Sequence, residues 1–208
     1  MLNKVPDFIQ NTPWQNHLWR IPTMEKVLYL TFDDGPTPGV TNKTIEILDE
    51  FDAKASFFCL GRNAEHHPDL VKKITEKGHR LGNHSYSHLK GYRTATDIYL
   101  EDVKLAARFL KTKLFRPPYG RIRVKQAKRI SNYFQLVMWD VLSHDYNQKI
   151  SADKCYRNVV NFVQPGSIIV FHDSEKAAPN MLAALPKTLE TLTKQGYRFD
   201  VIPYEYGK

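Results

Sequence analysis

The stretch LYLTFDDGPTPG, residues 28–39, runs from an apolar segment into two adjacent aspartates and a glycine–proline turn. The aliphatic, aromatic and β-branched residues before Asp33 are typical of a buried β-strand. Two like charges at the end of such a strand repel each other and lose hydration unless a metal ion or an arginine lies opposite. Aspartate and Gly-Pro are also ordinary turn formers, so this stretch by itself allows a plain turn as well as a site.

Length and composition indicate a globular chain. Its 208 residues suffice for one domain with a substantial core, and an α/β barrel of this size is normal as one domain. Hydrophobic residues at 42% and charged residues at 25% exclude a disordered or membrane class. The first twenty residues hold no continuous apolar core, which excludes a standard signal peptide in the chain as given, and no later run has transmembrane length. We expect one domain over residues 1–208, with residues 1–24 as an irregular N-terminal cap.

The net charge of +8 raises the question of a polyanionic partner. Basic residues fall mostly at helix-like spacing, as in residues 70–80 and 121–129, which is typical of solvated helix faces. No nucleic-acid-binding motif accompanies them, so we expect no nucleic acid as partner. We interpret the charge as surface character that suits an anionic polymer or a cell-wall surface.

Short β-branched or aromatic runs alternate with amphipathic helical stretches along the chain. The seven runs span residues 26–32, 54–60, 79–83, 113–116, 134–139, 167–172 and 197–202. Strands that alternate with helices in this way predict an α/β fold with a parallel sheet, closed or nearly closed into a barrel.

The predicted helices have apolar stripes and recognisable ends. The helix within residues 41–51 places Ile45 on such a stripe. A second helix, within residues 94–110, opens with Thr94 in capping-box spacing and includes Ile98 among its apolar positions. We expect both isoleucines to face the core.

Reactive side chains follow five of the seven predicted strands. They are Asp33 and Asp34, His84 and His88, the RPPYG segment at 116–120, the DVLSHDY segment at 140–146, and His172 with Asp173. Because the carboxyl ends of barrel strands form one face and that face carries the active site, we expect these side chains to converge.

A metal ion would explain the adjacent aspartates. His84 and His88 are four residues apart, so a helical turn or a tight loop brings both imidazoles to one point. This spacing alone is a weak signal, because paired histidines are often exposed polar residues. With one aspartate they form a two-histidine, one-carboxylate set that suits Zn²⁺, with Co²⁺, Ni²⁺ or Fe²⁺ as alternatives. The other aspartate would stay close enough to take a proton from water at the ion.

Five motifs follow one another along the chain: TFDDGP, H-S-x-x-H, R-P-P-Y-G, an S-x-D segment and a hydrophobic-H-D segment. In this order they resemble the polysaccharide deacetylase family, also known as carbohydrate esterase family four or the NodB-like family. The resemblance covers residues from about 26 to 203. It implies a distorted (β/α) barrel and a divalent-metal-dependent enzyme that removes N- or O-acetyl groups from sugar polymers.

The resemblance also implies roles for single residues of the first three motifs. Asp33 would be the general base, and Arg116 would orient it. Asp34, His84 and His88 would be the ligands of the ion.

The same resemblance assigns groups that would act on the substrate. The backbone amide of Tyr119 would help to form the oxyanion hole, and His172 would be the general acid. Val170 would contribute to the pocket that receives the acetyl methyl group.

The fourth motif departs from the family, which often reads Asp-Ser-x-Asp-Trp. This chain has Leu142, Asp145 and Tyr146 at the first, fourth and fifth of those positions. The retained Asp145 would pair with His172 and raise its pKa, as the family's second aspartate does. Tyr146 gives the substrate groove a smaller and more polar wall than tryptophan, so substrate preference is in doubt while catalysis should survive.

We therefore expect a hydrolase acting on an acetylated carbohydrate, first of all on the N-acetyl groups of poly- or oligosaccharides that contain N-acetylglucosamine, of the peptidoglycan or chitin type. A catalytically inactive carbohydrate-binding barrel and an O-acetyl esterase of the xylan type remain as alternatives. A haloacid-dehalogenase-type phosphatase is disfavoured, since it needs D-x-D spacing and the aspartates here are adjacent. The oligomeric state stays open, and a monomer is compatible with the sequence. The location of the protein also stays open: we expect it to be cytoplasmic if the chain is complete and exported if the chain is trimmed.

Overall fold

Strand β2, Val27–Asp33, lies inside the sheet, between β3 and β8, in this computed structural model, which describes residues 17–204. Its neighbours are β3 (Ala55–Cys59), β8 (Ile168–His172) and β9 (Arg198–Phe199), and all three pair with it in parallel. Six of its seven residues are buried. The apolar run of the sequence is therefore a strand covered on both faces, which is the usual situation in a parallel sheet.

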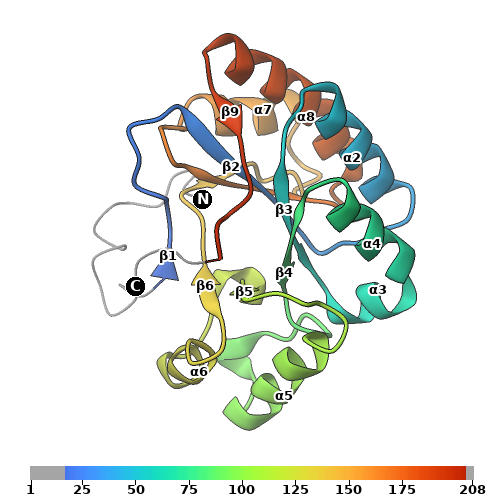
Figure 1. The fold of residues 1–208 in the computed structure, drawn as a ribbon, viewed down its shortest axis with the longest axis vertical. Helices are drawn as coiled ribbons and strands as arrows, with labels where there is room; N and C mark the ends of the chain where they lie inside the picture. Colours follow the sequence, from blue (N-terminus) through green and yellow to red (C-terminus); the bar gives the residue numbers. More distant parts are fainter. Residues whose placement is uncertain (1–16, 205–208) are drawn as a thin grey trace.

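The remaining strands extend the sheet on both sides of β2 (Figure 1). The order is β1-β6-β5-β4-β3-β2-β8-β7, and every neighbouring pair is parallel. The strands not yet named are β1 (His17–Leu18), β4 (Arg80–Asn83), β5 (Leu114–Phe115), β6 (Gln135–Val137) and β7 (Val141–Leu142).

The chain between β6 and β7, residues 138–140, brings the two sides of the sheet together. The backbone N–H of Met138 donates to the Leu18 carbonyl of β1 at 2.7 Å, and the N–H of Asp140 donates to the Ile168 carbonyl of β8 at 3.2 Å. The curled sheet therefore nearly closes along this seam. The predicted α/β fold, a distorted barrel of parallel strands, is confirmed, with two strands more than the seven runs predicted.

Helices lie on the outside of the curled sheet, as parallel strands joined by crossover connections require (Figure 1). They are α2 (Val40–Glu50), α3 (Gly61–His66), α4 (Pro68–Glu76), α5 (Thr96–Ala106), α6 (Val124–Ile130), α7 (Ala152–Val160) and α8 (Ala178–Lys194), with short 3₁₀ turns at Gly91–Arg93 and Pro118–Gly120. Pro68 occupies the first turn of α4, where a helix needs no N–H donor. Between residues 17 and 204, no helix combines the length and the apolar character that a membrane span needs.

The main hydrophobic core lies between the sheet and these helices. Phe32 of β2 stacks on Phe57 of β3 and Phe171 of β8, with ring centroids 5.0 and 6.1 Å apart. Ile45 of α2 is fully buried in the same cluster, as expected, together with residues of α8. Because successive strand residues point to opposite faces, the residue after Phe32 points into the barrel, and that residue is Asp33.

Each of the seven predicted runs contains a strand, and β1 and β7 are additional. Strand β1 lies within the segment expected to be an irregular cap, so that expectation is wrong for residues 17–18, while residues 1–16 fall outside the described part of the chain. Both additional strands are two residues long, which is too short for a periodic pattern to reveal them.

Helix α5 differs from its prediction at its start and in its orientation. It begins at Thr96, its N-cap is Ala95, and the Thr94 hydroxyl donates to a carbonyl of the preceding turn instead of capping the helix. The buried stripe of the helix begins at Tyr99, so Ile98 points outward and is 62% exposed. The expected place of Ile98 in the core is therefore wrong.

Two isoleucines on helices provide a matched test of this packing. Ile45→Ala should destabilise the fold by about 2–5 kcal/mol, because it removes fully buried methyl groups and leaves a cavity. Ile98→Ala should change the free energy of unfolding by less than about 0.5 kcal/mol, since that side chain is largely in water. Urea unfolding followed by circular dichroism measures both, and equal losses in the two variants would contradict the orientation of α5.

Candidate active site

The carboxyl ends of the strands open into one cleft of about 750 Å³. Asp33, the last residue of β2, is the register partner of His172, the last residue of β8. The predicted site residues that line the cleft are Asp33, Asp34, His84, His88, Tyr119, Tyr146, Val170 and His172. The two others, Arg116 and Asp145, are fully buried and contact Asp33 and His172, respectively.

Arg116 holds Asp33 from inside the barrel. Its Nη1 donates to Oδ1 of Asp33 and to the hydroxyl of Thr31, both at 2.7 Å. Its Nε and Nη2 donate to the carbonyls of Val137 and Met138, at the seam between β6 and β7. Burial lowers the pKa of Arg116, and the Asp33 carboxylate opposes that shift. With Oδ1 engaged, Oδ2 is the oxygen of Asp33 that remains to accept a proton.

The turn after Asp33 separates the two carboxylates. Asp34 has a φ of 79°, a left-handed backbone that is uncommon for a residue with a side chain. The carboxylate of Asp173 accepts hydrogen bonds from the Gly35 N–H at 3.0 Å and from the Thr41 hydroxyl at 2.6 Å. A Cβ at residue 35 would lie 2.1 Å from an oxygen of Asp173, so only glycine fits in this turn.

Asp34, His84 and His88 form a group that can hold a metal ion. One ligand atom from each lies within 4.8 Å of the others. Oδ1 of Asp34 is 3.2 Å from Nε2 of His88 and 3.7 Å from Nε2 of His84. Burial by itself would raise the pKa of Asp34, but the hydrogen bond from His88 and the charges of nearby histidines hold it well below its ordinary value. Two imidazoles and one ionised carboxylate are a donor set that suits zinc and leaves positions for water and substrate.

The two histidines lie in a tight loop after β4, where Ser85 and His88 both have positive φ. Nδ1 of His84 lies 2.8 Å from the Arg116 carbonyl, so Nδ1 carries the proton and Nε2 presents its lone pair toward Asp34. Burial lowers the pKa of His84 to about 4, which keeps this imidazole neutral at neutral pH. A neutral imidazole is the form that a metal ion binds, so the residues present fit the ion.

His172 and Asp145 form a second pair in the cleft wall. Nδ1 of His172 is 2.8 Å from Oδ1 of Asp145, and the His172 backbone N–H donates to Oδ2 at 2.7 Å. Burial alone would lower the pKa of His172, but the Asp145 carboxylate outweighs it and raises the pKa to about 9. His172 is therefore protonated at neutral pH, and Nε2 is its remaining donor.

Two tyrosines and two aliphatic side chains shape the cleft. Tyr119 is 53% exposed at its rim, and Tyr146 meets the His172 ring edge to face at 5.0 Å. Val170 of β8 is the register partner of Leu142 of β7, and both line the cleft. The aliphatic residue at position 142 thus joins Val170 in an apolar part of the wall.

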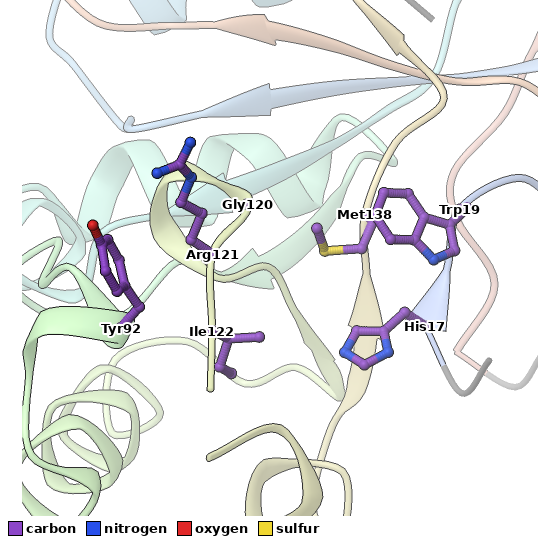
Figure 2. Close-up of a pocket in the computed structure, with 7 residues that line it drawn as sticks. All are labelled: His17, Trp19, Tyr92, Gly120, Arg121, Ile122 and Met138. Atoms are coloured by element: carbon purple, nitrogen blue, oxygen red, sulfur yellow. The ribbon is translucent and has the colours of Figure 1, made fainter. Parts of the chain in front are cut away.

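Two smaller cavities adjoin the cleft. The first, of about 460 Å³, is lined by His17, Trp19, Tyr92, Gly120, Arg121, Ile122 and Met138 (Figure 2). It shares Tyr92 and Arg121 with the cleft, and the second, of about 540 Å³, shares Asp34 and His88 with it. The reactive groups therefore lie in an extended depression rather than in a closed pocket.

Two features of the site escape sequence reasoning. The sequence places Asp173 among the reactive side chains and in the hydrophobic-H-D motif, but no residue pattern shows that it fixes the turn that separates the aspartates. Five of the six non-glycine residues with positive φ in the described part of the chain lie in or beside the cleft: Asp34, Ser85, His88, Tyr119 and His144. Such conformations cost on the order of 1–3 kcal/mol and persist only where the surroundings impose them, so no residue pattern reveals them.

The model of the family described as polysaccharide deacetylase matches residues 20–136. A peptidoglycan-N-acetylglucosamine deacetylase of Bacillus cereus is 34% identical over 193 residues, which cover 87% of this chain and 88% of that protein. A peptidoglycan-N-acetylglucosamine deacetylase of Listeria monocytogenes is also 34% identical, over 88% of this chain, but this chain covers only 39% of that longer protein.

A solved structure extends the likeness to the fold. The crystal structure of a peptidoglycan N-acetylglucosamine deacetylase in complex with 4-naphthalen-1-yl-N-oxidanyl-benzamide has a TM-score of 0.85 at 34% identity, covering 92% of this chain and 95% of that one. The family match spans more than half of the chain, and the relative and the solved structure extend it over most of the remainder. With the motifs, the barrel and the histidine–aspartate group in agreement, the chain belongs to the polysaccharide deacetylase family, the metal-dependent hydrolases of carbohydrate esterase family four.

Proposed function

We propose that this chain is a divalent-metal-dependent hydrolase that removes N-acetyl groups from the N-acetylglucosamine units of peptidoglycan- or chitin-type glycans. The main observation behind the proposal is that the two adjacent aspartates have different partners: Arg116 holds Asp33, whereas Asp34 lies with two histidines. Hydrolysis of an acetamide needs an activated water, a stabilised oxyanion and a proton for the departing amine. The names of the relatives support the same substrate.

Asp33 is the proposed general base. Its Oδ1 accepts a hydrogen bond from Arg116, which fixes the carboxylate and leaves Oδ2 to take the proton of the attacking water. This Oδ2 lies 4.0 Å from Nε2 of His84, so the base borders the proposed metal group.

Asp34, His84 and His88 are the proposed ligands of one divalent ion. Their donor set fits Zn²⁺ best, with Co²⁺ or Ni²⁺ as alternatives. When bound, such an ion polarises the acetyl carbonyl and lowers the pKa of water. The depressed pKa values of Asp34 and His84 keep both groups deprotonated at neutral pH, ready to bind.

His172 is the proposed general acid, because it is protonated at neutral pH and lines the cleft. Its Nε2 proton goes to the nitrogen of the departing amine, while Asp145 holds the ring in place and balances its charge. The backbone N–H of Tyr119 is proposed to donate to the developing oxyanion. Val170, with Leu142 beside it, offers an apolar wall for the acetyl methyl group.

Acetate release tests the proposed activity directly. We expect the purified chain to release acetate from peptidoglycan or from chitin oligomers, in preference to O-acetylated xylan. An inactive carbohydrate-binding barrel would release none from any substrate, and an O-acetyl esterase would act on xylan alone. Release from N-acetylated glycans no higher than that of the Asp33→Asn variant overturns the proposal.

Removal of the two proposed histidine ligands should remove the metal. Wild-type protein should carry about one divalent ion per chain by elemental analysis, and chelation should abolish activity reversibly. His84→Ala combined with His88→Ala should abolish stoichiometric binding. The matched control is His66→Ala combined with His67→Ala, an adjacent pair that is not part of the metal group, which should keep the ion. Full metal content in the variant with His84→Ala and His88→Ala would contradict the assignment of the two histidines as ligands.

Two isosteric variants separate the base from the ligand. Asp33→Asn removes the proton acceptor but keeps the shape, so the metal should stay while turnover falls by roughly 10²–10⁴-fold. Asp34→Asn replaces an anionic ligand by a weak neutral one, so metal affinity should fall and excess Zn²⁺ should restore part of the activity. Metal content and turnover are measured on both. The opposite pattern would reverse the two roles.

Asp145 should set the alkaline limit of activity. A general acid works only while protonated, so the rate falls as the pH rises through the pKa of His172, which is about 9. Asp145→Asn removes the carboxylate that raises this pKa, so the alkaline limb of the pH–rate profile should move down by about 1–3 pH units. Asp140→Asn is the control, since Asp140 is equally buried but bonds to the first residue of β8 rather than to the last. An alkaline limb that stays in place in Asp145→Asn excludes the assigned pair.

A further inference from the structure

Four cations line the cleft and take no part in the proposed reaction. They are Lys90, Arg93, Arg121 and Lys176, called the basic rim below. All four are solvent-exposed and come from three separate loops, which follow β4, the 3₁₀ turn at Pro118–Gly120, and β8. A position on three loops spreads the positive charge around the cleft instead of gathering it at one point.

Among the described residues, the members of the rim have no carboxylate partner, whereas several other surface cations do. Elsewhere Lys77 pairs with Asp49 at 2.6 Å, and Arg129 and Arg198 pair with carboxylates at 2.5 and 2.7 Å. Within residues 17–204, no salt bridge joins a member of the rim to an acidic side chain. Their charges are thus available to a ligand.

Negative charge inside the cleft does not neutralise the rim. Asp33 is paired with Arg116, and Asp34 belongs to the proposed metal group. Glu175, next to Lys176 in sequence, lines an adjoining cavity and not the cleft. A cleft with uncompensated charge of one sign attracts ligands of the opposite sign.

Three members of the rim lie near tyrosine rings that line the same cleft. The distances to the ring centroid are 5.3 Å for Lys90 over Tyr119, 5.7 Å for Arg93 over Tyr92, and 6.0 Å for Lys176 over Tyr146. Ring faces pack against the apolar faces of sugars, whereas ammonium and guanidinium groups bind anionic substituents. Arg121, the fourth member, also lines the cavity of Figure 2 and so reaches beyond the reaction centre.

We propose that the basic rim selects N-acetylated glycans that carry carboxylate groups on the sugars next to the one that is deacetylated. This selection rests on the proposed function, since the rim surrounds the cleft of that reaction. Cations on three loops suit single carboxylates on successive sugars better than one phosphate, which binds where several donors converge. A neutral glycan would engage the tyrosines alone.

Two tetrasaccharides isolate the effect of charge. One alternates N-acetylglucosamine with N-acetylmuramic acid, and the other is the same molecule with each carboxyl group converted to a methyl amide. At low ionic strength, kcat/KM of the wild type should be at least about tenfold higher for the acidic form, and added salt should reduce this ratio. The variant with Lys90→Gln, Arg93→Gln, Arg121→Gln and Lys176→Gln should bring the ratio close to one, mainly through KM for the acidic form.

A second quadruple variant controls for total charge. Lys43→Gln, Lys111→Gln, Lys113→Gln and Lys154→Gln remove the same number of charges from exposed positions outside the cleft, so the wild-type ratio should persist. Calorimetric binding of both tetrasaccharides tests the rim independently of turnover. A wild-type ratio near one in turnover and in binding, or equal effects of the two quadruple variants, overturns the selection by the rim. Selective binding of the acidic form without any acetate release overturns the proposed function and leaves the rim in place.

Discussion

The buried guanidinium of Arg116 is the interaction on which the arrangement of the site depends. Its side chain holds the carboxylate of Asp33, and its own carbonyl accepts the Nδ1 proton of His84. One residue of the loop after β5 thus orients both the proposed base and a proposed ligand. The same guanidinium donates to the carbonyls of Val137 and Met138, so it also ties the seam of the barrel to the site. Loss of one partner of such a buried pair typically costs about 3–5 kcal/mol, so the site and the barrel are stabilised together.

Adjacent aspartates are tolerated at the end of β2 because each carboxylate has its own positive or hydrogen-bonding partners. Asp33 faces Arg116 inside the barrel, and Asp34 faces two histidines in the cleft. A third carboxyl, that of Asp173, accepts a hydrogen bond from the N–H of Gly35, directly after the two aspartates. Burial raises the pKa of Asp173 to about 7, so this group is partly neutral at neutral pH and adds little repulsion. The turn therefore places three acids together without accumulating three full charges.

Two histidines of the same cleft have opposite protonation states for physical reasons that can be separated. His84 has no dominant carboxylate partner to offset its burial, and its pKa falls to about 4. His172 is largely buried as well, but it bonds to Asp145, and its pKa rises to about 9. One imidazole is thereby suited to bind a metal ion and the other to deliver a proton. Different environments shift the pKa values of two like groups in opposite directions, and one site thereby supplies both an acid and a ligand at the same pH.

The features of the fold and the site that depend on residues close together along the chain are predictable from the sequence. The alternation of strands and helices, the seven principal runs and the polar groups at their carboxyl ends are all local patterns, and they sufficed to predict the barrel and the residues that meet in the cleft. Motif order along the chain was equally local, and it led to the family.

Contacts between segments distant in sequence determine the properties that local sequence patterns do not predict. The two-residue strands β1 and β7 exist only because each pairs with a strand that is distant in sequence. Ile98 is exposed because α5 packs against the rest of the protein through the stripe that begins at Tyr99. The role of Asp173, the tautomer of His84 and the charge of His172 follow from groups between 27 and 138 residues away along the chain. Hydrogen bonds and burial between such distant segments arise only when the barrel closes, which is why these properties belong to the folded structure.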